Sequence, residues 1–210
     1  MHKTAGCILF IAVWTVAASG QPPPIPVEPA PAPAGTPART LLVFVPQQLF
    51  NEEEFDPALR RISQLGVRTL LVSADSGVAV SMSQLIVSID LALRNVSAAD
   101  FAGLVLIGGS GAAVYWDDSL LQAKCRNFAS NGKVLAAIGI APVTLARAGV
   151  LKGRRATVFR DRTTVDWLRQ AGAKYSFSGV VADRNIITAA SSDQARAFGQ
   201  AIADAVLKAR

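Results

Sequence analysis

Short apolar runs alternate with longer amphipathic stretches over most of this chain. The apolar runs are rich in Val, Ile and Leu and lie at 41–45, 67–73, 102–107 and 133–138. Runs that are apolar on both faces are typical of strands buried inside a parallel sheet. Stretches with apolar residues at helical spacing lie at 51–65, 116–129, 142–148, 164–171 and 193–208. The alternation predicts an α/β domain in which helices connect the strands of a mostly parallel sheet.

Cap and turn residues mark where these elements begin and end. Asn51 can cap the helix after the first strand, the glutamates at 52–54 suit its N-terminus electrostatically, and Gly66 ends it. Shorter runs, which predict edge strands or hairpins, lie at 78–80, 85–89, 179–182 and 186–188. The pattern therefore indicates one domain that begins at Thr40.

Composition supports a layered domain and argues against a nucleic-acid partner. The 210 residues suffice for one substantial domain, and 51% of them are hydrophobic while 17% are charged. Soluble chains typically carry about 25% charged residues, so most elements here should be covered on both faces. The formal net charge is +6, but the basic residues are scattered. Only Arg60–Arg61 and Lys152–Arg155 form clusters, without aromatic residues between them, so we expect no nucleic-acid binding.

The first 39 residues predict export and a tether. Residues 1–20 have a short polar start, an apolar core at 7–18 and small residues up to Gly20, as in a secretory signal peptide. The core is shorter than the ~20 residues of a membrane-spanning helix, so we expect a periplasmic or extracellular protein. A membrane anchor is the alternative if the segment is not cleaved. Residues 21–39 are rich in Pro and Ala and predict an extended linker before a domain at 40–210.

Removal of the signal would leave little of the usual catalytic chemistry. His2 is the only histidine and Cys7 is one of two cysteines, so the mature chain would keep Cys125 alone. This excludes an internal disulfide, a histidine-containing metal site and a histidine base. Cys125 shares a helix face with Leu121 and Phe128, which indicates a buried structural cysteine. We expect no metal ion.

Several motifs occur in an order and spacing that resemble one known family. They are Gly108–Ala112, Trp116–Asp118, Gly132–Ile138, Pro142, Leu145–Ala146, Ala148–Gly149, Leu151–Gly153 and Ile187–Thr188. Together they resemble the ThiJ/PfpI family of the class I glutamine amidotransferase-like superfamily, over roughly residues 40–208. The resemblance implies a flavodoxin-like three-layer α/β/α sandwich and usually a homodimer. Members of the family include glyoxalases, deglycase-type enzymes, peptidase-like proteins and chaperones.

The nucleophile position of that family is changed in this chain. The family motif Ala-Ile-Cys-His-Gly-Pro places a cysteine on a strained strand-to-helix turn. The matching segment is Ala137–Pro142, with Gly139 in place of the cysteine and Ile140 in place of the histidine. Neither residue can attack a carbonyl group or transfer a proton. Glycine accepts the backbone angles of such a turn, so the turn can persist without its chemistry.

The resemblance also implies the other residues of the site. The family acid, which hydrogen-bonds the cysteine, corresponds to Glu54. Glu53 takes this position if the alignment is shifted by one residue. With no thiol beside it, we expect this acid to persist as a helix cap or a relic, and a water-binding group or part of a remodelled pocket are the alternatives. The N–H groups of Gly109, Ser110 and Ile140 correspond to donors that face a bound oxyanion in the family. A small anionic or carbonyl ligand is therefore expected here.

Three functions remain open at this point. The preferred hypothesis is an exported ThiJ/PfpI-like domain that has lost the cysteine-dependent catalysis and serves as a ligand-binding or scaffold module. The alternative is a cysteine-independent hydrolase or lyase, in which Glu54 acts as a base on a water and the Gly109 and Ile140 N–H groups stabilise an oxyanion. A third is an envelope interaction protein that uses the linker or an edge strand. Residues 109–114 lack the third small residue of a dinucleotide-binding loop, so no cofactor is expected.

Overall fold

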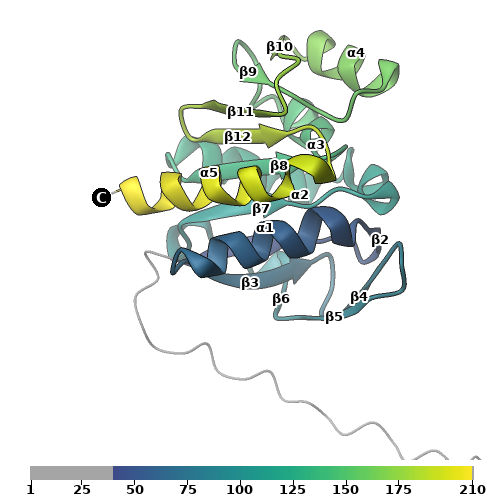
Figure 1. Ribbon diagram of the computed structural model, residues 1–210, viewed down its shortest axis with the longest axis vertical. Helices are drawn as coiled ribbons and strands as arrows, with labels where there is room; N and C mark the ends of the chain where they lie inside the picture. Colours follow the sequence, from purple (N-terminus) through teal and green to yellow (C-terminus); the bar gives the residue numbers. More distant parts are fainter. Residues whose placement is uncertain (1–39, 210) are drawn as a thin grey trace, which may run out of the picture. The chain divides into compact units, whose positions relative to one another are not determined.

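A seven-stranded sheet forms the centre of the domain (Figure 1). The computed structural model describes residues 40–209. The strands are β1 (Thr40–Phe44), β3 (Arg68–Ser73), β6 (Leu91–Ala92), β7 (Gly103–Leu106), β8 (Val134–Ile138), β11 (Val180–Asp183) and β12 (Ile186–Ala189). Their order is β11-β12-β8-β7-β1-β3-β6, and all neighbours are parallel except β11 and β12. The predicted mostly parallel α/β sheet is confirmed.

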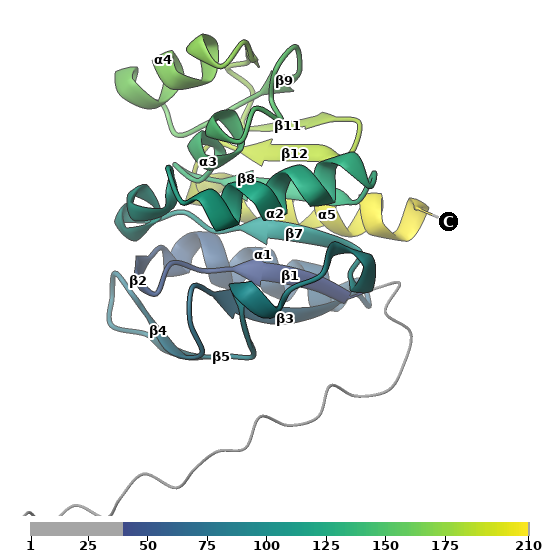
Figure 2. The same cartoon turned by 180° about the vertical axis from the view of Figure 1, so that it is seen from behind.

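Helices cover both faces of this sheet. The helices are α1 (Glu52–Gln64), α2 (Ser119–Ser130), α3 (Pro142–Arg147), α4 (Arg162–Gln170) and α5 (Ala195–Lys208). Figure 1 shows α1 and α5 in front of the sheet, and Figure 2 shows α2 and α3 on the opposite side. This is the three-layer α/β/α arrangement that the sequence predicts.

Alternation along the strands divides the core into two halves. In β1, Leu42 and Phe44 belong to the cluster under α2 and α3, whereas Leu41 and Val43 belong to the cluster under α1 and α5. All five residues of β1 are buried. Because successive side chains of a strand point to opposite faces, a strand with helices on both sides must be apolar throughout.

Two small sheets flank the main one. The first contains β2 (Gln48–Phe50), β4 (Gly77–Ser81) and β5 (Ile86–Ile89), and the second pairs β9 (Arg155–Ala156) with β10 (Lys174–Tyr175). Strands β4 and β5 are antiparallel, so the hairpin expected around 78–89 is confirmed. Strands β2, β9 and β10 have two or three residues, too few for an alternating pattern to reveal them from sequence.

Local capping explains why some elements differ from their predicted bounds. The helix expected from residue 116 begins at Ser119, because Asp118 caps it by accepting a hydrogen bond from the Leu121 N–H at 2.7 Å. The helix expected from 164 begins at Arg162 behind the cap Asp161. Short 3₁₀ turns fill several remaining connections: η2 (Leu93–Asn95), η3 (Ala98–Asp100), η4 (Ser110–Tyr115) and η5 (Ser192–Gln194).

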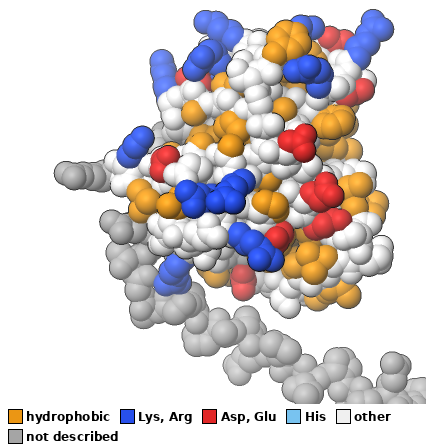
Figure 3. Space-filling view, in the orientation of Figure 1, with side chains coloured by type: hydrophobic (Ala, Val, Ile, Leu, Met, Phe, Trp, Pro, Cys, Tyr) orange, Lys and Arg blue, Asp and Glu red, His pale blue; other side chains and the backbone are white. Residues whose placement is uncertain are grey.

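The expected signal peptide at 1–20 and linker at 21–39 lie outside the described residues. Within residues 40–209, no helix has the length and apolar character needed to cross a membrane. Charged side chains on the face formed by α1 and α5 are mixed, with basic groups at several separate places and acidic groups among them (Figure 3).

Candidate functional site

The turn between β8 and α3 keeps the shape of a nucleophile elbow. Its first residue, Gly139, has a φ of +66°, a conformation that side chains disfavour. Two backbone hydrogen bonds hold it: the Gly139 N–H donates to Ala189 O at 3.1 Å, and the Phe159 N–H donates to Gly139 O at 2.8 Å. The turn is therefore fixed from two sides by segments that come later in the chain.

Glu54 lies beside this turn, in the first turn of α1. Its side chain is only 4% exposed. Oε2 accepts a hydrogen bond from the Gly108 N–H at 2.9 Å, and Oε1 accepts one from Asn51 Nδ2 at 3.3 Å. Burial raises the pKa of the Glu54 carboxyl to about 7, although both hydrogen bonds act in the opposite direction. Glu53 is exposed and its carboxylate accepts a hydrogen bond from the Ser192 hydroxyl at 3.4 Å. Glu54, and not Glu53, is therefore the acid beside the turn.

The Glu54 carboxyl occupies the space next to Gly139 where a side chain would begin. A Cβ atom built on Gly139 would lie 2.8 Å from both Cδ and Oε2 of Glu54, and closer still to Oε1. Distances below 3.0 Å are not tolerated by real Cβ atoms. A cysteine at this position would consequently require the Glu54 side chain to move.

Unpaired backbone donors follow the strands β7 and β8, whose ends lie near this carboxyl. Among residues 40–209, no protein acceptor satisfies the N–H groups of Gly109, Ser110 or Ile140. One of these donors lies near the acid, because a Cβ built on Gly108 would lie 2.6 Å from Glu54 Oε2 and 3.2 Å from Ile140 N. The Ser110 side chain is exposed and Ile140 is half-buried. The predicted site residues therefore meet at the carboxyl edge of the sheet, where parallel α/β sheets commonly bind ligands.

Three contributors were not assigned to the site from sequence. Asn51, expected only as a helix cap, caps Glu53 N and also donates to Glu54. Gly108 supplies the shortest hydrogen bond to that acid. Trp116 donates from Nε1 to Ile140 O at 3.2 Å and packs edge-on against Trp167 at 4.7 Å between ring centroids. The contacts of Gly108 and Trp116 join residues far apart in the chain, so the neighbouring sequence does not indicate them. Asn51 lies close to Glu54 in sequence, but its pattern indicates only the helix cap.

Cys125 takes no part in this arrangement. It lies on α2, is fully buried in the cluster under that helix and is a free thiol. Desolvation raises the pKa of the Cys125 thiol to about 12. This agrees with the predicted structural role. Within residues 40–209, no three side chains of the His, Cys, Asp or Glu type are grouped as metal ligands would be.

Comparison with known proteins now identifies the family. The profile of the DJ-1/PfpI family matches residues 39–205. The chain belongs to the DJ-1/PfpI family. Membership agrees with the predicted ThiJ/PfpI resemblance and covers essentially all of the described domain.

Relatives of this DJ-1/PfpI domain include archaeal proteins. An uncharacterised protein of Methanocaldococcus jannaschii is 36% identical over 172 residues, which are 81% of this chain and 83% of that protein. A deglycase of Thermococcus kodakarensis is 31% identical over 139 residues, 66% of this chain and 82% of the deglycase.

A crystal structure supports the same family fold. The ThiJ/PfpI domain protein from Brachyspira murdochii superposes with a TM-score of 0.78 at 27% identity, over 84% of this chain and all of that chain. The flavodoxin-like architecture expected from the sequence is thus shared with a solved member of the family.

Proposed function

We propose that this protein is a DJ-1/PfpI domain without cysteine-dependent catalysis, and that its elbow binds a small ligand. The observation that carries the proposal is the position of the Glu54 carboxyl, which fills the space that a side chain at Gly139 would need. The remaining thiol, Cys125, is buried in a different part of the core. The elbow thus keeps its backbone geometry but offers no nucleophile.

The elbow is rich in hydrogen-bond donors. Three backbone N–H groups, those of Gly109, Ser110 and Ile140, have no protein acceptor among residues 40–209. Near neutral pH, a Glu54 carboxyl with a pKa of about 7 is protonated in part of the population and then donates as well. Backbone N–H groups without a protein acceptor are suited to bind a carbonyl or carboxylate oxygen. A small carbonyl or carboxylate compound is therefore the proposed ligand class.

One observation favours a second function, a hydrolase or lyase that uses Glu54 as general base. Its pKa of about 7 lies near the pH at which a general base works best. The 4% exposure of the side chain acts against this function, because a base must reach water and substrate. Deglycase relatives such as the Thermococcus kodakarensis protein suggest glycated compounds as the first substrates to try.

Turnover distinguishes the two functions. The full chain and a Glu54→Gln variant are assayed with methylglyoxal and glycated amino acids, beside a cysteine-containing deglycase as positive control. We expect neither form of this protein to exceed the uncatalysed rate. Turnover that is present in the wild type and lost in Glu54→Gln would instead establish the general-base enzyme.

Ligand binding is tested separately by amide chemical shifts. Glyoxylate, which has both a carbonyl and a carboxylate group, is titrated into isotope-labelled full-length protein. We expect saturable shifts at the amides of Gly109, Ser110 and Ile140, and binding that weakens as the pH rises above about 7 and Glu54 ionises. Glu54→Gln is neutral at every pH and should remove this pH dependence. Glu53→Gln is the matched control, because Glu53 lies in the same turn but is exposed. Shifts that do not saturate, or that spare these three amides, would contradict ligand binding at the elbow.

Export and dimerisation form part of the same proposal. Residues 1–39 have the composition of a signal peptide and a linker, which supports an exported chain that stays anchored if the signal is not cleaved. Cell fractionation and N-terminal sequencing of the recovered protein test this, and a cytoplasmic chain that keeps Met1 would contradict it. A homodimer is proposed from family membership alone, and sedimentation measurements would detect it.

A further inference from the structure

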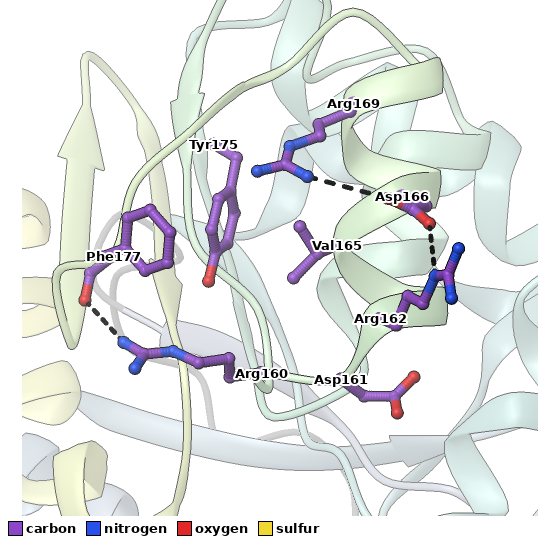
Figure 4. Close-up of a pocket in the computed structure, with 8 residues that line it drawn as sticks. All are labelled: Arg160, Asp161, Arg162, Val165, Asp166, Arg169, Tyr175 and Phe177. Carbon is purple, nitrogen blue, oxygen red and sulfur yellow. Dashed lines mark hydrogen bonds and ion pairs between the residues drawn. The ribbon is translucent and has the colours of Figure 1, made fainter.

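A second candidate site lies away from Glu54, between α4 and the segment that follows β10. It is a surface hollow of about 200 Å³, here called the α4 hollow (Figure 4). Figure 4 shows the Tyr175 ring and Val165 facing the same open space, with Arg169 at one end and Arg160 at the other. Val165 is buried and Tyr175 is half-buried, so the hollow has an apolar interior with charged groups at its rim.

Arg160 supplies a cation at one end of the hollow. Its guanidinium lies 5.1 Å from the centroid of the Phe177 ring and donates to Phe177 O at 3.4 Å. Within residues 40–209, Arg160 forms no ion pair with an Asp or Glu. The stacking on Phe177 holds the guanidinium in place while its remaining donors face the solvent.

The other charges of the hollow are already engaged. Asp161 accepts a hydrogen bond from the Thr163 N–H at 2.8 Å as the cap of α4. Asp166 is shared by Arg162 at 3.9 Å and Arg169 at 3.7 Å. The three arginines of the lining exceed the two aspartates by one positive charge. A ligand with a single negative charge would balance the α4 hollow.

The aromatic side chains give the hollow a surface for a ring. Tyr175 and Phe177 pack edge to face with 5.0 Å between their centroids, and the Arg169 guanidinium lies 5.5 Å from the Tyr175 centroid. Phe177 is 68% exposed, so its ring is accessible to a ligand in the hollow. Burying a flat apolar group here would remove both ligand and protein surface from water.

We propose that the α4 hollow binds a small aromatic monocarboxylate. The carboxylate pairs with the Arg160 guanidinium, whose planar fork suits two carboxylate oxygens. The ring lies in the space between Tyr175 and Val165. A volume of about 200 Å³ is below the ~300 Å³ at which typical ligand pockets begin, so the ligand is small. The site is separate from the elbow and does not depend on the function proposed for Glu54.

Benzoate is the probe for this proposal, measured by calorimetry on the full-length chain. Benzyl alcohol has the ring without the charge, acetate has the charge without a planar ring, and inorganic phosphate carries more charge. We expect saturable benzoate binding that is stronger than that of all three comparison compounds. Arg160→Gln should weaken it by about tenfold, the size of effect that one charge-assisted pair typically has. Tyr175→Leu should weaken it as well.

Matched variants separate this site from general charge effects. Arg60→Gln removes one exposed arginine from α1 and should leave benzoate affinity unchanged. Because the elbow is itself proposed to bind small carboxylates, Arg160→Gln is also measured in a Glu54→Gln background, and the same loss of benzoate affinity there distinguishes the α4 hollow from the elbow. Circular dichroism of each variant establishes that it is folded. The proposal is overturned if benzoate does not saturate, if phosphate or acetate binds as tightly, or if the folded Arg160→Gln and Tyr175→Leu variants bind benzoate as the wild type does.

Discussion

The Glu54 carboxyl stands where the first side-chain carbon of any residue at position 139 would have to be. Gly139 also has a φ of +66°, so two independent features select glycine there. Restoring a thiol at Gly139 would require a rearrangement around Glu54 as well as a substitution.

Gly139→Ala should destabilise the protein more than an alanine at an unobstructed left-handed glycine. Gly149 has a φ of +76° and no atom within 4 Å of its missing Cβ, so Gly149→Ala measures the backbone cost alone. That cost is about 1–2 kcal/mol. Overlap with Glu54 should add about 1–3 kcal/mol to Gly139→Ala. Urea unfolding of both variants measures the difference, and equal free energies of unfolding would contradict the overlap.

Removing the Glu54 side chain should relieve part of that penalty. In Glu54→Ala/Gly139→Ala, the added methyl group can enter the space left by the carboxyl. We expect the double variant to lose less stability than the sum of the single variants, by about 1–3 kcal/mol. A double-mutant cycle in urea gives this coupling energy. Strictly additive losses would show that the two residues do not compete for space.

The stability contributed by Glu54 should fall as the pH rises. The pKa of its carboxyl is about 7 in the fold and 4.5 as the reference value. The folded state therefore binds the proton more tightly, and the contribution is complete below pH 4.5 and lost above about pH 7. A pKa shift of this size changes the free energy of unfolding by about 3 kcal/mol.

Comparison with Glu54→Gln isolates this contribution from other titrating groups. Free energies of unfolding are measured for both proteins at about pH 5 and about pH 8. The wild type should lose stability relative to the variant over this interval, whereas Glu53→Gln should follow the wild type because its side chain is exposed. Parallel curves for the wild type and Glu54→Gln would indicate an unshifted carboxyl.

Asn51→Asp should raise the pKa of Glu54 further. Asp retains the helix cap on Glu53 N, but it replaces the amide that donates to Glu54 Oε1 with a second carboxylate. Asn51→Ser keeps a cap without the added charge and should give a smaller increase. Carbon-13 NMR of the Glu54 carboxyl follows the titration. An unchanged or lower pKa in Asn51→Asp would mean that this hydrogen bond is not formed.

Cys125 should resist thiol reagents in the native protein. The side chain is fully buried, and burial raises the pKa of the thiol to about 12, so very little thiolate is available. We expect iodoacetamide to modify Cys125 only in denaturant, as located by mass spectrometry of peptides. Rapid modification under native conditions would point to a reactive thiol and weaken the proposed loss of cysteine chemistry.

Much of the fold could be predicted because it follows from local patterns. Apolar runs such as those of β1 and β8 are long enough to identify buried strands, and the cap Asn51 locates the start of α1. Strands as short as β9 could not be predicted, since two residues cannot show an alternation. The sequence places the start of α2 at residue 116, which is too near the N-terminus. The 3₁₀ turn η4 and the cap Asp118 come first, and the helix begins at Ser119.

The sequence by itself determined the α/β class, the family resemblance and the absence of a nucleophile at Gly139, because each can be seen in neighbouring residues. The tertiary structure alone decided that Glu54, rather than Glu53, reaches the elbow and fills the space beside Gly139. It also brought Arg160 and Phe177 together. These relationships join residues far apart in the chain, and only the order of strands in the sheet and the burial of helix faces bring such residues into contact.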